Sequence, residues 1–218
     1  MSAPAVPKDA ATVILVREEA GRLEVLLLRR PDGQRFMGGA WVFPGGKREE
    51  RDGAGEPGLR AAAVREVAEE VGIAVAPDDL VAWARWVTPE REPVRFDARF
   101  YLAPVAADAT LRPDAREVAD VAWLAPNEAL ARAAAGALRV MPPTLRNLEL
   151  LAGYGALAEA LAAARTVEPP TVMPVMDVLD GAIAILLPGD PLHPDPVRRV
   201  PGPTRIVLRE TGFRSEDP

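Results

Sequence analysis

The chain has 218 residues, of which 49% are hydrophobic and 27% are charged, and its formal net charge is −6. This length allows a sizeable core in one or at most two domains, and the acidic balance argues against a general nucleic-acid or anionic-membrane surface, which would need a basic stripe. The absence of cysteine excludes disulfides, thiolate metal sites and cysteine nucleophiles, and a single histidine, His193, disfavours a zinc site built on imidazoles.

The first half of the chain predicts three strands followed by a helix. Two β-rich runs, 11–16 and 23–28, flank Glu18-Glu19-Ala20-Gly21 and predict a hairpin, and a third strand at 41–43 runs into the turn Pro44-Gly45-Gly46. Glycines let a backbone carbonyl or amide approach a ligand closely. The segment 65–73 then predicts a helix that ends at Gly72.

The predicted helix concentrates negative charge on one face. Glu66, Glu69 and Glu70 stand at i, i+3 and i+4, whereas Val67 and Val71 fall on the adjoining face toward a core. By itself this pattern is equally typical of a solvated acidic face and of a site for a hard divalent cation, which needs converging oxygen ligands. The upstream glycine turn favours the cation site, and a site without sulfur or imidazole ligands favours Mg²⁺ or Mn²⁺.

The second half of the chain predicts further strands, two helices and a tail. Residues 74–87 predict one or two strands, 94–102 alternate charged with apolar side chains, and a strand at 118–123 leads into a short helix at Pro126. Thr144 predicts the cap of a longer helix that reaches about residue 164. From Val167 onward the chain is rich in proline around strand-like runs at 182–187 and 204–209, which predicts an extension laid against the domain, or else a partly ordered tail.

The segment 46–73 resembles the signature of the Nudix hydrolases, in which Gly, five residues, Glu and seven residues precede Arg-Glu-apolar-x-Glu-Glu-x-Gly-apolar. The second half matches at every position, but Gly46 lies nineteen positions before Arg65, where the signature has fourteen. Counted back from Arg65, the early Glu falls on Pro57, one place from Glu56, so the role of Glu56 stays open. We interpret the glycine-rich segment 48–58 as an insertion.

This resemblance implies an α/β protein with the Nudix fold, an α/β/α sandwich around a mixed sheet. It covers residues 9–165, and 166–218 are expected to form a Pro-rich C-terminal extension with two short strands packed on the domain. The activity it implies is metal-dependent hydrolysis of a nucleoside diphosphate linked to another moiety. The metal ligands it implies are Glu66, Glu69, Glu70 and the carbonyl of Gly45, Arg65 is expected to orient a helix carboxylate, and the general base stays open among Glu66, Glu90, Glu92 and Glu117.

A second resemblance concerns the substrate. Arg30, Arg35, Gly39 and the run Phe43-Pro44-Gly45-Gly46 are similar to the motif of the coenzyme A diphosphatases in this superfamily, although Leu28 and Pro31 depart from it. The runs 86–90 and 95–101 also resemble the branch that contains the peroxisomal coenzyme A diphosphatase. The residues expected to contact substrate are Arg30, Arg35, Gly46, Lys47 and Arg95.

Several alternatives remain at this point. Arg30 and Arg35 are also typical of ordinary charges at the end of a strand. ADP-ribose or NADH is the alternative substrate, and a regulatory Nudix module that binds a nucleotide without hydrolysing it is the alternative of another class. The intact Glu66, Glu69 and Glu70 set favours an enzyme. We expect a small-molecule nucleotide as the partner, no nucleic-acid or membrane partner and a cytoplasmic location, because we find neither a signal-peptide pattern nor a membrane-spanning apolar run. A homodimer is left open.

Overall fold

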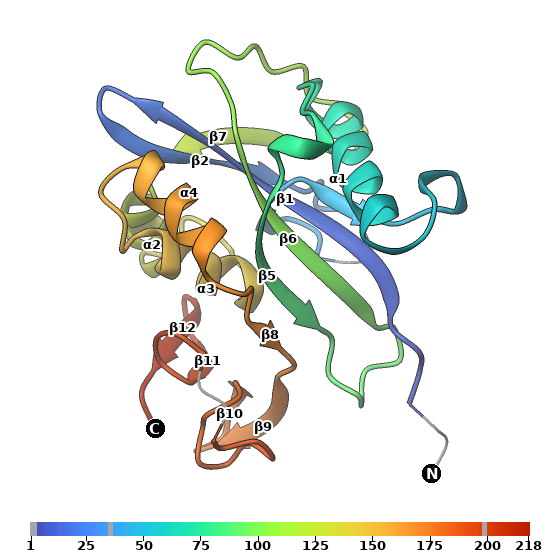
Figure 1. The fold of residues 1–218 in the computed structure, drawn as a ribbon. Coiled ribbons are helices and arrows are strands. Elements are labelled where there is room, and N and C mark those ends of the chain that lie inside the picture. The colour runs from blue at the N-terminus through green and yellow to red at the C-terminus, as the bar shows by residue number, and fades with distance from the viewer. Residues whose placement is uncertain (1–3, 35–36, 198–199) are drawn as a thin grey trace.

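The computed structural model describes residues 4–34, 37–197 and 200–218. Figure 1 shows how its elements are arranged and labels the four helices and most of the strands. In chain order they are β1 (Lys8–Glu19), β2 (Arg22–Arg29), β3 (Trp41–Val42), β4 (Gly45–Lys47), η1 (Glu50–Asp52), α1 (Gly55–Val71), η2 (Pro77–Asp79), β5 (Val81–Val87), β6 (Phe96–Pro104), β7 (Asp120–Leu124), α2 (Pro126–Ala134), α3 (Pro142–Leu151), α4 (Leu157–Thr166), β8 (Thr171–Val172), β9 (Val175–Leu179), β10 (Ala182–Leu186), β11 (Arg205–Arg209) and β12 (Gly212–Glu216).

The main sheet is mixed, as predicted. Its strand order is β3-β2-β1-β6-β5-β8, with β4 paired to β1 and β7 paired to β2. Strand β1 runs parallel to β6 and antiparallel to β2 and β4. In this register Ala11 lies opposite Gly46 on one side and opposite Arg99 on the other, which places the glycine strand β4 at the centre of the sheet.

Helices cover both faces of this sheet, so the long strands are apolar at consecutive positions instead of alternating. Residues 11, 13, 14, 15 and 16 of β1 are all fully buried. The odd-numbered side chains of β1 join a core with Val67 and Val71 of α1, whereas the even-numbered side chains Ile14 and Val16 join a core with residues of α2, α3 and α4. Figure 1 shows α1 on one side of the sheet and α2 to α4 on the other. This is the α/β/α sandwich expected from the sequence.

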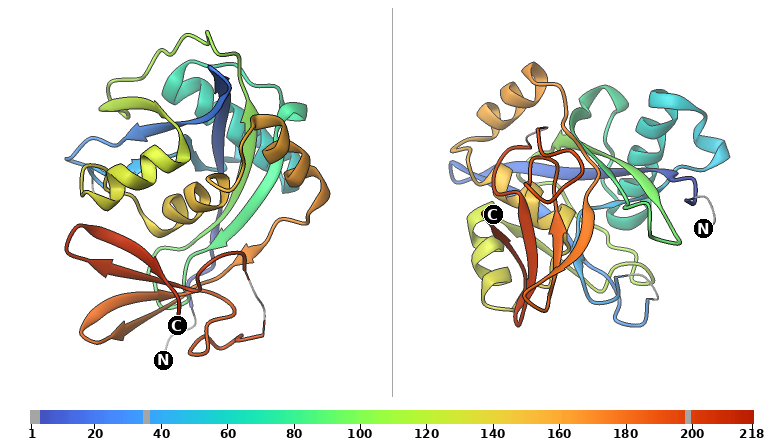
Figure 2. Two further views of the ribbon diagram at one scale, coloured as in Figure 1. Left: turned by 90° about the vertical axis from the view of Figure 1, so that its left-hand side faces the viewer. Right: turned by 90° about the horizontal axis from the view of Figure 1, so that it is seen from below.

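The C-terminal residues form a second, antiparallel sheet of four strands in the order β12-β11-β10-β9. Strand β12 contacts α2 and α3, and the two views of Figure 2 show the β11–β12 hairpin beside these helices. Ile185 and Ile206 of the small sheet are part of the same core as α3. The two runs that predicted strands are β10 and β11, but the extension also contains β8, β9 and β12, which the sequence analysis did not predict.

Three local predictions were wrong. The helix expected from Thr144 to about residue 164 is two helices, α3 and α4, because Gly153 and Gly155 lie in the break between them. The chain enters α3 at Met141, so Thr144 is a buried residue of its first turn and not its cap. The glycines after Pro44 also form a strand, β4, rather than only a turn. Among the described residues, no helix is long and apolar enough to cross a membrane.

Candidate active site

Helix α1 brings the three predicted carboxylates to the glycine strand. It ends at Gly72, whose φ of 70° is the left-handed conformation that favours glycine and whose amide donates to Ala68 O at 3.1 Å. Val67 and Val71 are fully buried against the sheet. Glu66 and Glu70 therefore lie at the junction of α1 with β4, whereas half of the Glu69 side chain is exposed.

The glycines of β4 allow the carboxylates to approach the backbone. The amide of Gly45 donates to Glu70 Oε2 at 2.8 Å. A Cβ atom on Gly46 would lie 2.4 Å from Glu66 Oε1, and one on Gly45 would lie 2.4 Å from Ala11 O. A side chain at Gly45 would collide with the backbone of β1, so this position needs glycine, whereas a side chain at Gly46 would displace the carboxylate of Glu66.

Arg65 is bound to two of the carboxylates. Its Nη1 donates to Glu66 Oε1 at 2.7 Å and to Glu69 Oε2 at 3.0 Å. The rest of the guanidinium is bound by Asp52, whose Oδ1 and Oδ2 accept from Nε at 3.0 Å and from Nη2 at 2.9 Å. This two-point contact lowers the pKa of Asp52 and raises the pKa of Arg65.

Asp52 is a site residue that the sequence analysis missed. It stands six positions after Gly46, where the Nudix signature has its early Glu, so counting forward from the glycine would have found it. We counted back from Arg65 and reached Pro57 and Glu56. The structure instead places Glu56 away from this site, where its Oε1 accepts from Tyr101 OH at 3.1 Å and from Arg60 Nε at 3.0 Å. The extra residues thus follow Asp52 and form the beginning of α1.

Burial raises the proton affinity of the two inner carboxylates. Glu70 is 6% exposed, and this burial is the main reason that its pKa rises to about 8, although the Gly45 amide and the charge of Arg30 act in the opposite direction. Burial also raises the pKa of Glu66, against the effect of Arg65. The charge of Glu117 raises the pKa of both residues, which shows that this loop carboxylate lies within electrostatic reach of the pair.

The carboxylate oxygens of this site are the kind of ligand that a hard divalent cation prefers, but they do not converge on one point. Within the described ranges, no group of three or more His, Cys, Asp or Glu side chains is arranged to hold a metal ion. The reason is visible for Glu69, whose Oε1 is bound by Arg51 Nη2 at 3.2 Å while Oε2 is bound by Arg65. Nevertheless, Glu70 is buried, the Glu66 side chain is only 13% exposed, and both carboxylates have raised pKa values. Oxygen ligands with too little countercharge are what Mg²⁺ or Mn²⁺ would neutralise.

Arg30 is the predicted substrate residue that the structure brings to this site. It follows β2, and its charge lowers the pKa of Glu70. Its Nε is buried and has no hydrogen-bond partner among the described residues. A buried donor without a partner is unfavourable unless a ligand binds it. Lys47 contributes its backbone carbonyl, which accepts from Arg65 Nη2 at 3.1 Å, and its own side chain is exposed.

Other predicted residues are not brought to the carboxylates. Arg95 is 7% exposed and donates to Thr88 O at 3.0 Å and to Ala5 O at 2.8 Å, so its contacts are structural and argue against a substrate role. Glu90 and Glu92 lie in the connection between β5 and β6, beyond the end of the sheet where Phe96 pairs with Lys8.

The expected roles of Arg35 and of the Gly45 carbonyl stay predictions. Arg35 lies outside the described residues, so its substrate role is untested. The structure likewise does not test the expected role of the Gly45 carbonyl as a metal ligand.

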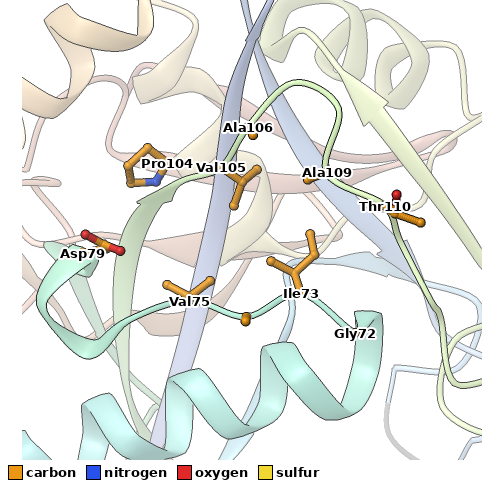
Figure 3. Close-up of a pocket in the computed structure, with 10 residues that line it drawn as sticks. Gly72, Ile73, Val75, Asp79, Pro104, Val105, Ala106, Ala109 and Thr110 are labelled. Carbon is orange, nitrogen blue, oxygen red and sulfur yellow. The ribbon is translucent and has the colours of Figure 1, made fainter.

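A cavity of about 360 Å³ lies at the C-terminal end of α1, and none of the three helix carboxylates lines it. Figure 3 shows Ile73 and Val75 on one side of it and Val105 and Ala109 on the other, with Asp79 at its edge. None of the predicted site residues lines this cavity, and we assign it no part in the chemistry.

Comparison with known proteins identifies the family. The model of the NUDIX domain matches residues 6–144, well over half of the chain. The chain belongs to the Nudix family. Nudix hydrolase 7 of Caenorhabditis elegans is 25% identical over 223 residues, which cover 86% of this chain and 75% of that protein.

Solved structures agree on the fold. A NUDIX hydrolase from Alicyclobacillus acidocaldarius is 26% identical with a TM-score of 0.65, over 72% of this chain and 96% of its own. The NUDIX domain of Shewanella oneidensis NrtR, solved with ADP ribose, has a TM-score of 0.53 at 18% identity, over 66% of this chain and 86% of its own, and shows the fold alone. The predicted Nudix fold is confirmed, and the chain is a hydrolase of this family, whose members act on nucleotide substrates and generally use Mg²⁺ or Mn²⁺.

Proposed function

We propose that this Nudix protein is a divalent-cation-dependent diphosphatase and that coenzyme A or an acyl-coenzyme A is its substrate. The observation that carries the first part is the buried carboxylate of Glu70, which lies at the glycine strand beside the largely shielded Glu66. An acidic residue buried without an ion pair is destabilising in the free protein, and such residues mark functional sites.

We assign a separate role to each residue of the site. A Mg²⁺ or Mn²⁺ ion held by Glu66, Glu69 and Glu70 would neutralise the diphosphate and acidify the attacking water. Asp52 fixes the guanidinium of Arg65, which in turn holds Glu66 in place. Glu117 is the loop carboxylate in electrostatic reach of this pair, so we assign to it the removal of a proton from the attacking water.

Arg30 supports the choice of substrate. Its buried, unpartnered Nε beside Glu70 is suited to an anionic oxygen of the ligand. Coenzyme A carries a 3′-phosphate that ADP-ribose and NADH lack, and a charge-assisted contact to it would contribute roughly 1.5 to 3 kcal/mol, or about one to two orders of magnitude in specificity. We propose attack within the diphosphate, which releases 3′,5′-ADP and 4′-phosphopantetheine or its acyl derivative.

The test is a substrate panel with Mg²⁺ and with Mn²⁺, in which mass spectrometry identifies the products. Coenzyme A and short-chain acyl-coenzyme A should be hydrolysed faster than dephospho-coenzyme A, ADP-ribose and NADH at equal concentration. Faster hydrolysis of ADP-ribose, the ligand of the Shewanella domain, would replace this substrate assignment. Binding of a nucleotide without turnover would instead support the regulatory module.

Arg30→Ala should lower kcat/KM for coenzyme A by about 10- to 100-fold and reduce the preference over dephospho-coenzyme A. The matched control is Arg22→Ala, which removes an exposed arginine from the opposite end of β2. An unchanged preference in the Arg30 variant would show that this arginine does not contact the 3′-phosphate.

A further inference from the structure

Arg51 links the turn before α1 to the carboxylate helix. It lies in the 3-10 turn η1, just before the additional residues that follow Asp52. Its Nη2 lies 3.2 Å from Glu69 Oε1, and its Nε lies 2.8 Å from Glu49 Oε2. One guanidinium group therefore bridges a carboxylate of the turn and a carboxylate expected to bind the cation.

The turn holds this arginine in place. The amide of Glu49 donates to Asp52 Oδ2 at 2.7 Å, and the amide of Asp52 donates back to Glu49 O at 3.1 Å. Asp52 is also bound to Arg65, and its side chain is only 5% exposed. These contacts fix the backbone of η1 beside α1, from where the exposed Arg51 side chain reaches Glu69.

The two arginines that bind Glu69 differ in how readily they can release it. Arg65 is 13% exposed and is held by the two-point contact with Asp52. Arg51 is 60% exposed and Glu69 is 49% exposed, so solvent screens their contact, and ion pairs of this kind contribute at most about 1 kcal/mol. A cation that binds Glu69 can thus displace Arg51 while Arg65 stays in place.

We propose that Arg51 is a positioning residue that holds Glu69 Oε1 until a divalent cation displaces it. The turn η1 then lowers the cation affinity of the site, both through the ion pair that must break and through the positive charge beside the incoming cation. This inference rests on the proposed cation-dependent function and concerns the chain's own residues.

The test measures Mn²⁺ binding by calorimetry on protein freed of metal with EDTA. Arg51→Gln should lower the Kd for Mn²⁺ by roughly two- to tenfold, since the lost ion pair alone accounts for up to about fivefold. The matched control is Arg132→Gln, which removes a similarly exposed arginine from an ion pair with Glu128 on the remote helix α2 and should change the Kd by less than about twofold.

A second background separates the role of Arg51 from a general effect on folding. In Glu69→Gln protein the carboxylate that Arg51 holds is gone, so adding Arg51→Gln should increase the Mn²⁺-dependent rise in melting temperature by less than it does in the wild-type background. An equal or weaker Mn²⁺ affinity in the single Arg51 variant would overturn the inference. If the wild-type chain does not bind Mn²⁺, the proposed cation dependence is wrong as well. If the wild type binds Mn²⁺ and the Arg51 variant binds it no more tightly, only this inference is wrong.

Discussion

Replacing Glu70 with glutamine should stabilise the metal-free protein at alkaline pH but not at acidic pH. Burial raises the pKa of Glu70 from 4.5 to about 8, so between these values the folded state retains a proton that the unfolded state has lost. The free energy of unfolding therefore falls as the pH rises from about 4.5 through 8 and levels off above. Glutamine carries no charge and retains an oxygen that can accept from the Gly45 amide.

The size of the effect follows from the difference between the two pKa values. Each pH unit corresponds to about 1.4 kcal/mol, which gives an upper limit of about 5 kcal/mol for the stability that ionised Glu70 removes. This exceeds the few tenths of a kcal/mol that relief of repulsion among Glu66, Glu69 and Glu70 on an exposed helix would give. We expect the variant to be more stable than the wild type by about 2 to 5 kcal/mol at pH 9 and within about 1 kcal/mol of it at pH 5.

The assay is urea unfolding in EDTA at several pH values, with the difference between variant and wild type plotted against pH. Glu69→Gln is the matched control, because that carboxylate is half exposed and is paired with Arg51 and Arg65. Its loss should lower stability by at most about 1 kcal/mol, with little dependence on pH between 5 and 9. A difference for Glu70→Gln that does not change with pH would refute the argument that burial holds Glu70 protonated.

Three further changes test other parts of the site and of the fold. Asp52→Asn should lower kcat/KM by about 10- to 100-fold with the fold intact, because Arg65 loses the charge of its partner Asp52. Kinetics measure the activity and circular dichroism checks the fold. Kinetics equal to those of the wild type would show that Asp52 does not position Arg65. Glu117→Gln should lower kcat at least about tenfold, whereas Glu90→Gln should not; equal effects would leave Glu117 without a special role. Arg146→Ala should cost roughly 2 to 4 kcal/mol in urea unfolding, because this buried α3 side chain donates to Pro203 O of the extension, and an unchanged midpoint would show that the extension does not depend on this contact.

The parts of the site that could be predicted are those set by local periodicity. Glu66 and Glu70 were recognised because helical spacing alone brings them to one face, and Gly45 and Gly46 because glycine marks a close approach of the backbone. Asp52 was missed because the distance along the chain to Arg65 is changed by the additional helical residues, while the distance from Gly46 is not. A contact between a turn and a helix depends on where the insertion lies, and spacing alone left this ambiguous.

Prediction of the C-terminal extension from sequence was limited in a similar way. Strands β10 and β11 were predicted because they are apolar runs, whereas β12 was not, because it contains Arg214 and Glu216 and is recognisable mainly from its pairing with β11. A stronger local signal was overlooked at Asp180-Gly181, where φ values of 49° and 78° form the turn between β9 and β10. An Asp-Gly pair is typical of a tight hairpin.

The burial of Glu70 also bears on the choice between an enzyme and a regulatory nucleotide-binding module. A module that only binds a nucleotide has no need of an ionisable group in a position that destabilises the fold above pH 8, whereas a cation offsets that charge when it binds. Added Mn²⁺ should therefore raise the melting temperature of the wild type more at pH 9, where Glu70 is ionised without metal, than at pH 5, and this difference should shrink in Glu70→Gln. An equal rise at both pH values would separate cation binding from the ionisation of Glu70 and would remove the main electrostatic argument for the enzyme.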